Sequence, residues 1–153
     1  MKSGQLPRSF ELRFDWKVDA DGDTRINYGN RLILEYRCLD DAGNQESARP
    51  PEDRAGALLA SDRAGPYLGI KGPAHSAVRP AGGWNTGRIL CTADKLEHWL
   101  NGQRTAAVDL TASGFESALR ADLDSGPRLR LLNRRNAHGG TFRNLRLRVL
   151  PAQ

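Results

Sequence analysis

The chain has 153 residues, a length typical of one domain with a single hydrophobic core, and we expect one domain over residues 1–153. Hydrophobic residues make up 39% of the chain and form no run of about eighteen apolar residues, so we expect no membrane-spanning helix. The net charge of +5 comes largely from arginine, which raises the question of a nucleic-acid partner.

The arginines near the C-terminus have the spacing of strand residues. Arginine alternates with leucine and valine through residues 145–149, and the same alternation runs through 128–131. This pattern is typical of strands whose charged face is solvated and whose other face is buried. No aromatic residues interleave with these arginines to stack on bases, so we expect no nucleic-acid partner.

The chain carries no recognisable targeting or metal-binding signal. No apolar segment follows Met1–Gly4, so we expect no signal peptide in this chain. Cys38 and Cys91 both lie in predicted strands, where they could be buried thiols or a disulfide. No Cys/His pair has the spacing of a metal motif, and no phosphate-binding or dinucleotide-binding fingerprint occurs. We therefore expect no metal and no cofactor.

The first strand is predicted by strict alternation. Apolar residues occupy every second position from Phe10 to Val18, which indicates a half-buried antiparallel strand. Asp19–Asp23 then suggests either a turn or a calcium loop of the D-x-D-x-D-G kind. Gly22 comes two places early for calcium and the twelfth position is Asn30 instead of glutamate, so we expect a hairpin turn.

Two further strands are expected at Thr24–Tyr28 and Arg31–Leu39. The stretch Asp40–Gly65 contains Pro50-Pro51 and several Gly and acidic residues, which predicts a long loop without regular strand. A short helical turn is plausible within Glu52–Leu59. Irregular backbone is expected from Lys71 to His75.

The clearest supersecondary motif lies between Gly82 and Val108. A short apolar strand, Ile89–Cys91, is followed by turn residues and by a second, alternating strand over Leu96–Asn101. Asn101-Gly102 is a strong hairpin signal because both residues tolerate positive φ. With the returning strand Arg104–Val108, the sequence predicts a three-stranded meander.

The remaining elements complete an all-β pattern. Thr111–Asp124 is ambiguous, with one helical turn at Phe115–Leu119, and the last two strands are expected at Leu129–Asn133 and Thr141–Leu150. We expect an antiparallel β-sandwich of jelly-roll type, with two sheets around one core.

Several motifs resemble those of one family. They are Phe10-Glu11-Leu12-Arg13, Glu35-Tyr36-Arg37-Cys38-Leu39-Asp40, the approach Gly69–Asn85 ending in Trp-Asn, the strand ending in Leu100-Asn101-Gly102, and Phe142-Arg143-Asn144-Leu145. In this order they resemble the concanavalin A-like lectin/glucanase sandwiches, and within them the 3-keto-disaccharide hydrolase domain family. The resemblance implies an exported or periplasmic bacterial protein. Compared with the family, this chain is expected to have shortened N-terminal strands. A missing edge strand would leave a sheet edge open to self-association with a second copy.

The family name implies a glycoside oxidised to a ketone at C3, with a small oligosaccharide or glycoside as partner. That carbonyl acidifies the C2–H, so a base can remove the proton and expel the glycosidic oxygen, after which water adds. We expect Glu35 as the base, His98 and His75 as further proton carriers, and Arg37 or Arg143 as stabilisers of the enolate. Substrate binding is expected from the residues Arg37, Trp84, Lys71, His138 and Arg143.

Other interpretations of these residues are open. Glu35 could simply pair with an adjacent arginine, and His98 lies between Leu96 and Leu100, as a core histidine would. The family's glutamine is replaced by Arg37, and its tyrosine near Leu59 or Leu68 is absent. These departures favour an alternative function, a lectin-like binding module without catalysis. A purely structural sandwich that pairs through its edge is a third interpretation.

Overall fold

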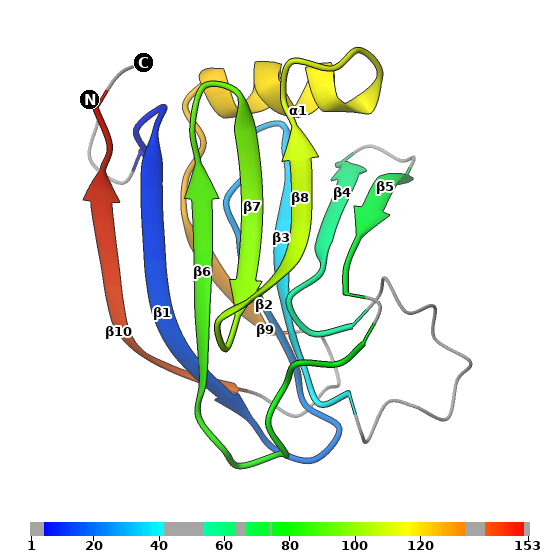
Figure 1. The fold of residues 1–153 in the computed structure, drawn as a ribbon, viewed down its shortest axis with the longest axis vertical. Helices are drawn as coiled ribbons and strands as arrows, with labels where there is room; N and C mark the ends of the chain where they lie inside the picture. The colour runs from blue at the N-terminus through cyan, green and yellow to red at the C-terminus, as the bar shows by residue number, and fades with distance from the viewer. Residues whose placement is uncertain (1–4, 42–53, 64–66, 74, 134–139, 152–153) are drawn as a thin grey trace.

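A computed structural model describes residues 5–41, 54–63, 67–73, 75–133 and 140–151. Ten strands and one helix follow one another in these residues (Figure 1). The elements are β1 (Phe10–Val18), β2 (Asp23–Asn27), β3 (Leu32–Leu39), β4 (Leu58–Asp62), β5 (Tyr67–Lys71), β6 (Asn85–Cys91), β7 (Lys95–Leu100), β8 (Gln103–Asp109), α1 (Phe115–Asp124), β9 (Arg130–Asn133) and β10 (Gly140–Val149).

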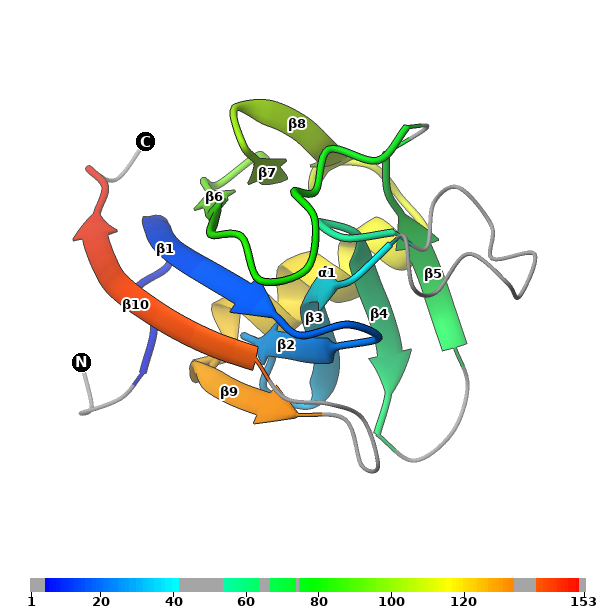
Figure 2. The same ribbon diagram turned by 90° about the horizontal axis from the view of Figure 1, so that it is seen from below.

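The strands form two antiparallel sheets that pack face to face (Figure 2). The front sheet has the strand order β10-β1-β6-β7-β8, and the back sheet has the order β5-β4-β3-β2-β9. This arrangement confirms the expected antiparallel β-sandwich. The helix α1 is not long and apolar enough to cross a membrane, and no other helix occurs in the described ranges.

The core lies between the sheets and follows the alternation of the strands. On β1, Phe10, Leu12, Phe14, Trp16 and Val18 are all at most 3% exposed, whereas the residues between them point to the outer face. Burying five large side chains from one strand removes much apolar surface from water, and this is the main force that holds the sheets together.

The predicted meander is confirmed as β6, β7 and β8. Asn101 and Gly102 form the tight turn between β7 and β8 with φ of 50° and 83°, the positive angles that an Asn-Gly hairpin turn requires. The Asn101 side chain also accepts a hydrogen bond from the Thr86 backbone N–H at 2.9 Å. The turn is therefore tied to the start of β6.

The helix α1 is longer than the single turn expected at Phe115–Leu119. It covers one end of the sandwich (Figure 1), with Leu119 and Leu123 at most 2% exposed. The buried Asp122 carboxylate accepts hydrogen bonds from the backbone N–H groups of residues 30, 31 and 32 at 2.8–3.1 Å. These bonds fix the β2–β3 turn to the helix, a long-range constraint that no local pattern indicates.

Two strands were not expected. β4 lies inside the stretch predicted as a loop, and β5 ends at Lys71, where irregular backbone was expected. Both strands are short and follow Gly and Pro, so their local signal is weak, but pairing with β3 satisfies the β4 backbone. Of the helical turn expected at Glu52–Leu59, residues 52 and 53 lie outside the described residues, and Leu58 and Leu59 belong to β4.

The expectation of a buried inner face is only partly met at β9 and β10. β1 lies inside the front sheet, and β10 forms its edge. Leu147 and Val149 face the same side as the core residues of β1, yet they are 49% and 60% exposed, and Leu131 of β9 is 45% exposed. The sandwich is open on this side because β9 and β10 are the last strands of their sheets.

His98 connects the two sheets through hydrogen bonds in the core. This fully buried residue of β7 has Nε2 2.6 Å from the Tyr28 hydroxyl and Nδ1 3.1 Å from the Gly56 carbonyl oxygen. Because a carbonyl only accepts, Nδ1 carries the proton and Nε2 accepts from Tyr28. Burial lowers the pKa of His98 from 6.5 to about 4, so the imidazole is neutral at physiological pH.

His98 should make the stability of the fold depend on pH. In the unfolded chain His98 takes up a proton below about pH 6.5, whereas in the folded chain it does so only near pH 4. The free energy of unfolding therefore decreases as the pH falls between these values. The loss amounts to about 3 kcal/mol. His98→Gln should be less stable at neutral pH by about 1–3 kcal/mol, since a hydrogen bond is lost.

Urea unfolding of both proteins between pH 7 and pH 4 tests this. The difference between them should shrink as the pH falls, because glutamine does not titrate. Parallel curves at all pH values would show that the folded protein accepts a proton on His98 as easily as the unfolded chain does.

Candidate functional site

Strand alternation places Glu35 and Arg37 side by side on the outer face of the back sheet. Their neighbours Leu34, Tyr36 and Cys38 fill the core, so the two charged side chains of β3 point away from it. In the hairpin formed with β2, Arg25 lies directly opposite Arg37, and Asn27 lies opposite Glu35. The structure therefore brings two of the predicted site residues together.

Two residues of β2 complete a charged group with them. Arg25 Nη1 is 2.6 Å from Glu35 Oε2, Arg25 Nη2 is 3.2 Å from Asp23 Oδ1, and Arg37 Nη2 is 3.7 Å from Asp23 Oδ2. We call Asp23, Arg25, Glu35 and Arg37 the back-sheet cluster. Its acids and Arg37 are at most 7% exposed. The pairing of Glu35 with an adjacent arginine, one of the two interpretations of this residue, is thus present.

The environment of Glu35 strengthens it as a base. Burial raises the pKa of its carboxyl above the ordinary value of 4.5, and the nearby charges of Arg25 and Arg37 only partly offset this effect. Buried ion pairs add little net stability, because desolvation of both charges offsets their attraction. A raised pKa beside two guanidinium groups is the kind of perturbation found at functional sites.

Arg25 and Asp23 were not among the predicted site residues. A signal for them exists in the sequence, because Asp23 and Arg25 are two residues apart, as Glu35 and Arg37 are. Given the β2–β3 hairpin, side chains at this spacing share one face of a sheet. The register that brings Arg25 to Glu35 is set by the turn at residues 28–31, which α1 fixes through Asp122.

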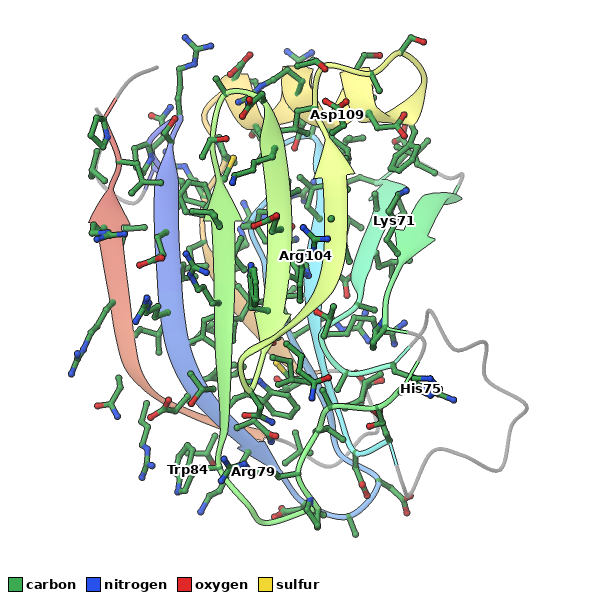
Figure 3. All side chains as sticks on the ribbon, viewed as in Figure 1. Lys71, His75, Arg79, Trp84, Arg104 and Asp109 are labelled. Carbon is green, nitrogen blue, oxygen red and sulfur yellow. The ribbon has the colours of Figure 1, made fainter. Side chains whose placement is uncertain are left out.

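The predicted histidines do not join the back-sheet cluster. His98 lies in the closed core with both ring nitrogens engaged, so the interpretation as a core histidine describes its position. His75 is exposed in the segment between β5 and β6. Figure 3 shows that His75, Trp84 and Lys71 lie at three separate places on the molecule. His138 lies outside the described residues.

Lys71 and Trp84 lie on other surfaces than the cluster. Lys71 is opposite Leu58, a core-facing residue, and its Nζ is 6.0 Å from the Phe115 ring centre. It therefore points to the opposite side of the back sheet from Glu35. Trp84 precedes β6, and the Arg143 guanidinium lies 3.7 Å from its ring centre.

The pair Trp84 and Arg143 belongs to the outer face of the front sheet. Arg143 lies opposite Asp15, and its Nε is 3.3 Å from the Asp15 carboxylate. Lys17 Nζ is also 4.8 Å from the Trp84 ring centre. The ring is therefore occupied by cations of the protein itself, and it is separated from Glu35 by the whole sandwich.

The described residues hold no group of three or more His, Cys, Asp or Glu side chains arranged for a metal. Cys38 and Cys91 are free thiols. An open concavity of about 590 Å³ lies on the front sheet and contains none of the predicted site residues. It is lined by Asp94, Lys95, Glu97, Ala107, Val108, Asp109 and Thr111.

Solved structures with this fold include proteins connected with carbohydrates. A candidate glycosyl hydrolase from Parabacteroides distasonis is 20% identical, with a TM-score of 0.65 over 95% of this chain and 80% of that one. The carbohydrate-binding module CBM66 from Bacillus subtilis is 8% identical, with a TM-score of 0.58 over 95% and 77%. Lactose- and MES-liganded congerin II is 12% identical, with a TM-score of 0.56 over 95% and 93%.

At these identities the likeness shows the fold alone. No curated protein sequence matches the chain. The sequence model of one family, described as the 3-keto-alpha-glucoside-1,2-lyase-like domain, matches residues 3–148. This match includes β1 to β9 and nearly all of β10, with the back-sheet cluster among them. The chain therefore belongs to the family of 3-keto-alpha-glucoside-1,2-lyase-like domains, a family related to carbohydrates.

Proposed function

We propose that this domain cleaves 3-keto glycosides by elimination, at the outer face of the back sheet, with Glu35 as the base. The observation that carries the proposal is the buried Glu35 carboxylate, which has a raised pKa, contacts Arg25 and is close enough to Arg37 to be affected by its charge. The family description adds that related domains are lyase-like toward 3-keto-alpha-glucosides.

The first step is proton abstraction. Glu35 takes the proton from C2, and the electron pair of the broken C–H bond forms an enolate with the C3 carbonyl. A carboxylate kept out of water is a stronger base than one in bulk solvent, and a base is most useful when its pKa lies near the working pH. The raised pKa of Glu35 is a shift in that direction.

The second step is loss of the leaving group. The enolate electrons form the C1–C2 double bond as the C1–O bond breaks, the leaving oxygen takes up a proton from water, and Glu35 returns its proton to the solvent. Water can then add across the double bond at C1. In this proposal the positive charges of Arg25 and Arg37, which act on Glu35, also stabilise the negative charge that develops on the carbonyl oxygen.

A second candidate function is binding without catalysis. It is favoured by the 2.6 Å contact between Arg25 and Glu35, since a carboxylate held in a closed ion pair has to leave its partner before it can act as a base. In that case the cluster would hold sugar hydroxyls through its charged groups. The fold likeness to CBM66 and congerin II is compatible with this alternative.

Glu35→Gln should separate the two functions. The amide keeps the shape of the side chain but cannot take the C2 proton, so turnover of a 3-keto-disaccharide should fall by about a hundredfold or more. The matched unoxidised disaccharide should not be cleaved by either protein, because its C2–H is not acidified. Product release is followed by chromatography.

Glu97→Gln is a matched control, because Glu97 is also a buried glutamate that pairs with an arginine, Arg104 at 3.1 Å. It lies on the front sheet and should retain normal turnover. Saturable binding of keto sugars without cleavage would move the protein to the binding class. Full activity of Glu35→Gln would rule out Glu35 as the base.

Arg37→Gln should test the stabilisation of the enolate. Arg37 is 7% exposed and contributes a positive charge beside Glu35, so its loss should lower kcat by about tenfold, with a smaller change in KM. Arg37→Lys keeps the charge but loses the planar fork, so its kcat should lie between those of the parent protein and of Arg37→Gln. An unchanged kcat in Arg37→Gln would show that Arg37 does not act on the transition state.

A further inference from the structure

The outer face of the front sheet carries a row of arginines that the proposed function does not use. Arg146 of β10 lies opposite Arg13 of β1, and Arg13 lies opposite Arg88 of β6. Arg88 lies opposite Trp99 of β7, and Trp99 lies opposite Arg104 of β8. We call these four arginines, together with Trp99, the arginine row. With strands about 4.8 Å apart, the row is about 19 Å long.

Such a row is unfavourable for the fold alone. Like charges directly opposite each other on neighbouring strands repel. Glu11 offsets part of this, because its carboxylate is 2.7 Å from Arg88 Nε, 3.1 Å from Arg13 Nε and 3.5 Å from Arg148 Nη2. At the other end, Glu97 is 3.1 Å from Arg104.

The positive charge is only partly neutralised. Five arginines, counting Arg148, meet two glutamates, and no acidic side chain among the described residues pairs with Arg146. The side chains of Arg13, Arg104 and Arg148 are 55–67% exposed, so a large ligand can reach them. An arrangement that opposes local stability is expected where a partner supplies the missing negative charges.

We propose that the arginine row binds a linear polyuronate, a polysaccharide with a carboxylate on each sugar. The planar guanidinium fork matches a carboxylate in geometry and can form two parallel hydrogen bonds with it. A pyranose unit is comparable in length with the spacing between strands, so successive carboxylates can reach the arginines on β10, β1 and β6, and a further one can reach Arg104 on β8 beyond Trp99. Membership of a carbohydrate-related family supports a glycan as the polyanion.

The row suits a nucleic acid less well. Trp99 is its aromatic residue, and the Arg88 guanidinium lies 5.5 Å from the Trp99 ring centre while the indole N–H donates to Glu97 at 3.3 Å. The ring is thus engaged by the protein and is not presented to stack on bases. The row also lies on a broad sheet face, whereas readers of duplex DNA insert a helix or a narrow ribbon into a groove.

The arginine row lies on the opposite side of the sandwich from Glu35, and the proposal does not depend on catalysis at the back-sheet cluster. A chain with both surfaces could hold a polymer on one face while the other face acts on a small glycoside. Removal of the row should therefore leave turnover at the back sheet unchanged.

The test measures affinity for an oligogalacturonate long enough to cross the five strands, by calorimetry at low salt. Arg13→Ser/Arg146→Ser should weaken binding by roughly tenfold or more, since charge-assisted hydrogen bonds are lost. The melting temperature should be unchanged or higher, because two opposed like charges are removed. The control Arg31→Ser/Arg128→Ser removes the same charge from exposed arginines off this face and should bind as the parent does.

Two further ligands decide the chemistry. The methyl-esterified oligogalacturonate has the same sugars without the charges and should bind at least tenfold more weakly, and salt should weaken binding of the acid form. The proposal is overturned by equal binding of the ester, by an equal loss in the control variant, or by no binding of the acid form. Single-stranded DNA of matched charge that binds as tightly would also overturn it.

Discussion

Side chains along each strand of this sandwich point alternately to one face of the sheet and to the other, and this alternation decides which polar side chains can meet. Glu35 and Arg37 share the outer side of β3, whereas His98 on β7 points into the core. Trp84 and Arg143 meet on the outer face of the other sheet. The predicted site residues are thus divided among surfaces that the core separates, and a single catalytic group cannot contain all of them.

The back-sheet cluster and the arginine row show two uses of charge on a sheet. In the cluster, two acids and Arg37 are buried beside the partly buried Arg25, and burial is strong enough to raise the pKa of Glu35 despite the arginines. In the row, the arginines are exposed and outnumber their acids. The first arrangement suits chemistry on a small molecule, and the second suits contact with a large anion.

The sequence was sufficient for most of the fold because the strong signals are local. The alternation from Phe10 to Val18 and the Asn101-Gly102 turn were each predictable from a few neighbouring residues. β4 and β5 were missed because they are stabilised by strand pairing, β4 with β3 and β5 with β4, and not by their own sequence. Pairing of Glu35 with an arginine was one of the interpretations, but its partner Arg25 was not predicted, because that choice depends on the register between strands. The resemblance to the family, in contrast, led to the prediction of Glu35 as a site residue without any knowledge of register.

The most direct test of this account is a nuclear magnetic resonance titration of the isotopically labelled protein with a small 3-keto glycoside, using Glu35→Gln so that the ligand persists. The account predicts that the amides of β2 and β3 around residues 25, 35 and 37 shift with saturation, while those around Trp84 and Arg143 do not. Shifts centred on Trp84 and Arg143, with the back sheet unchanged, would contradict it.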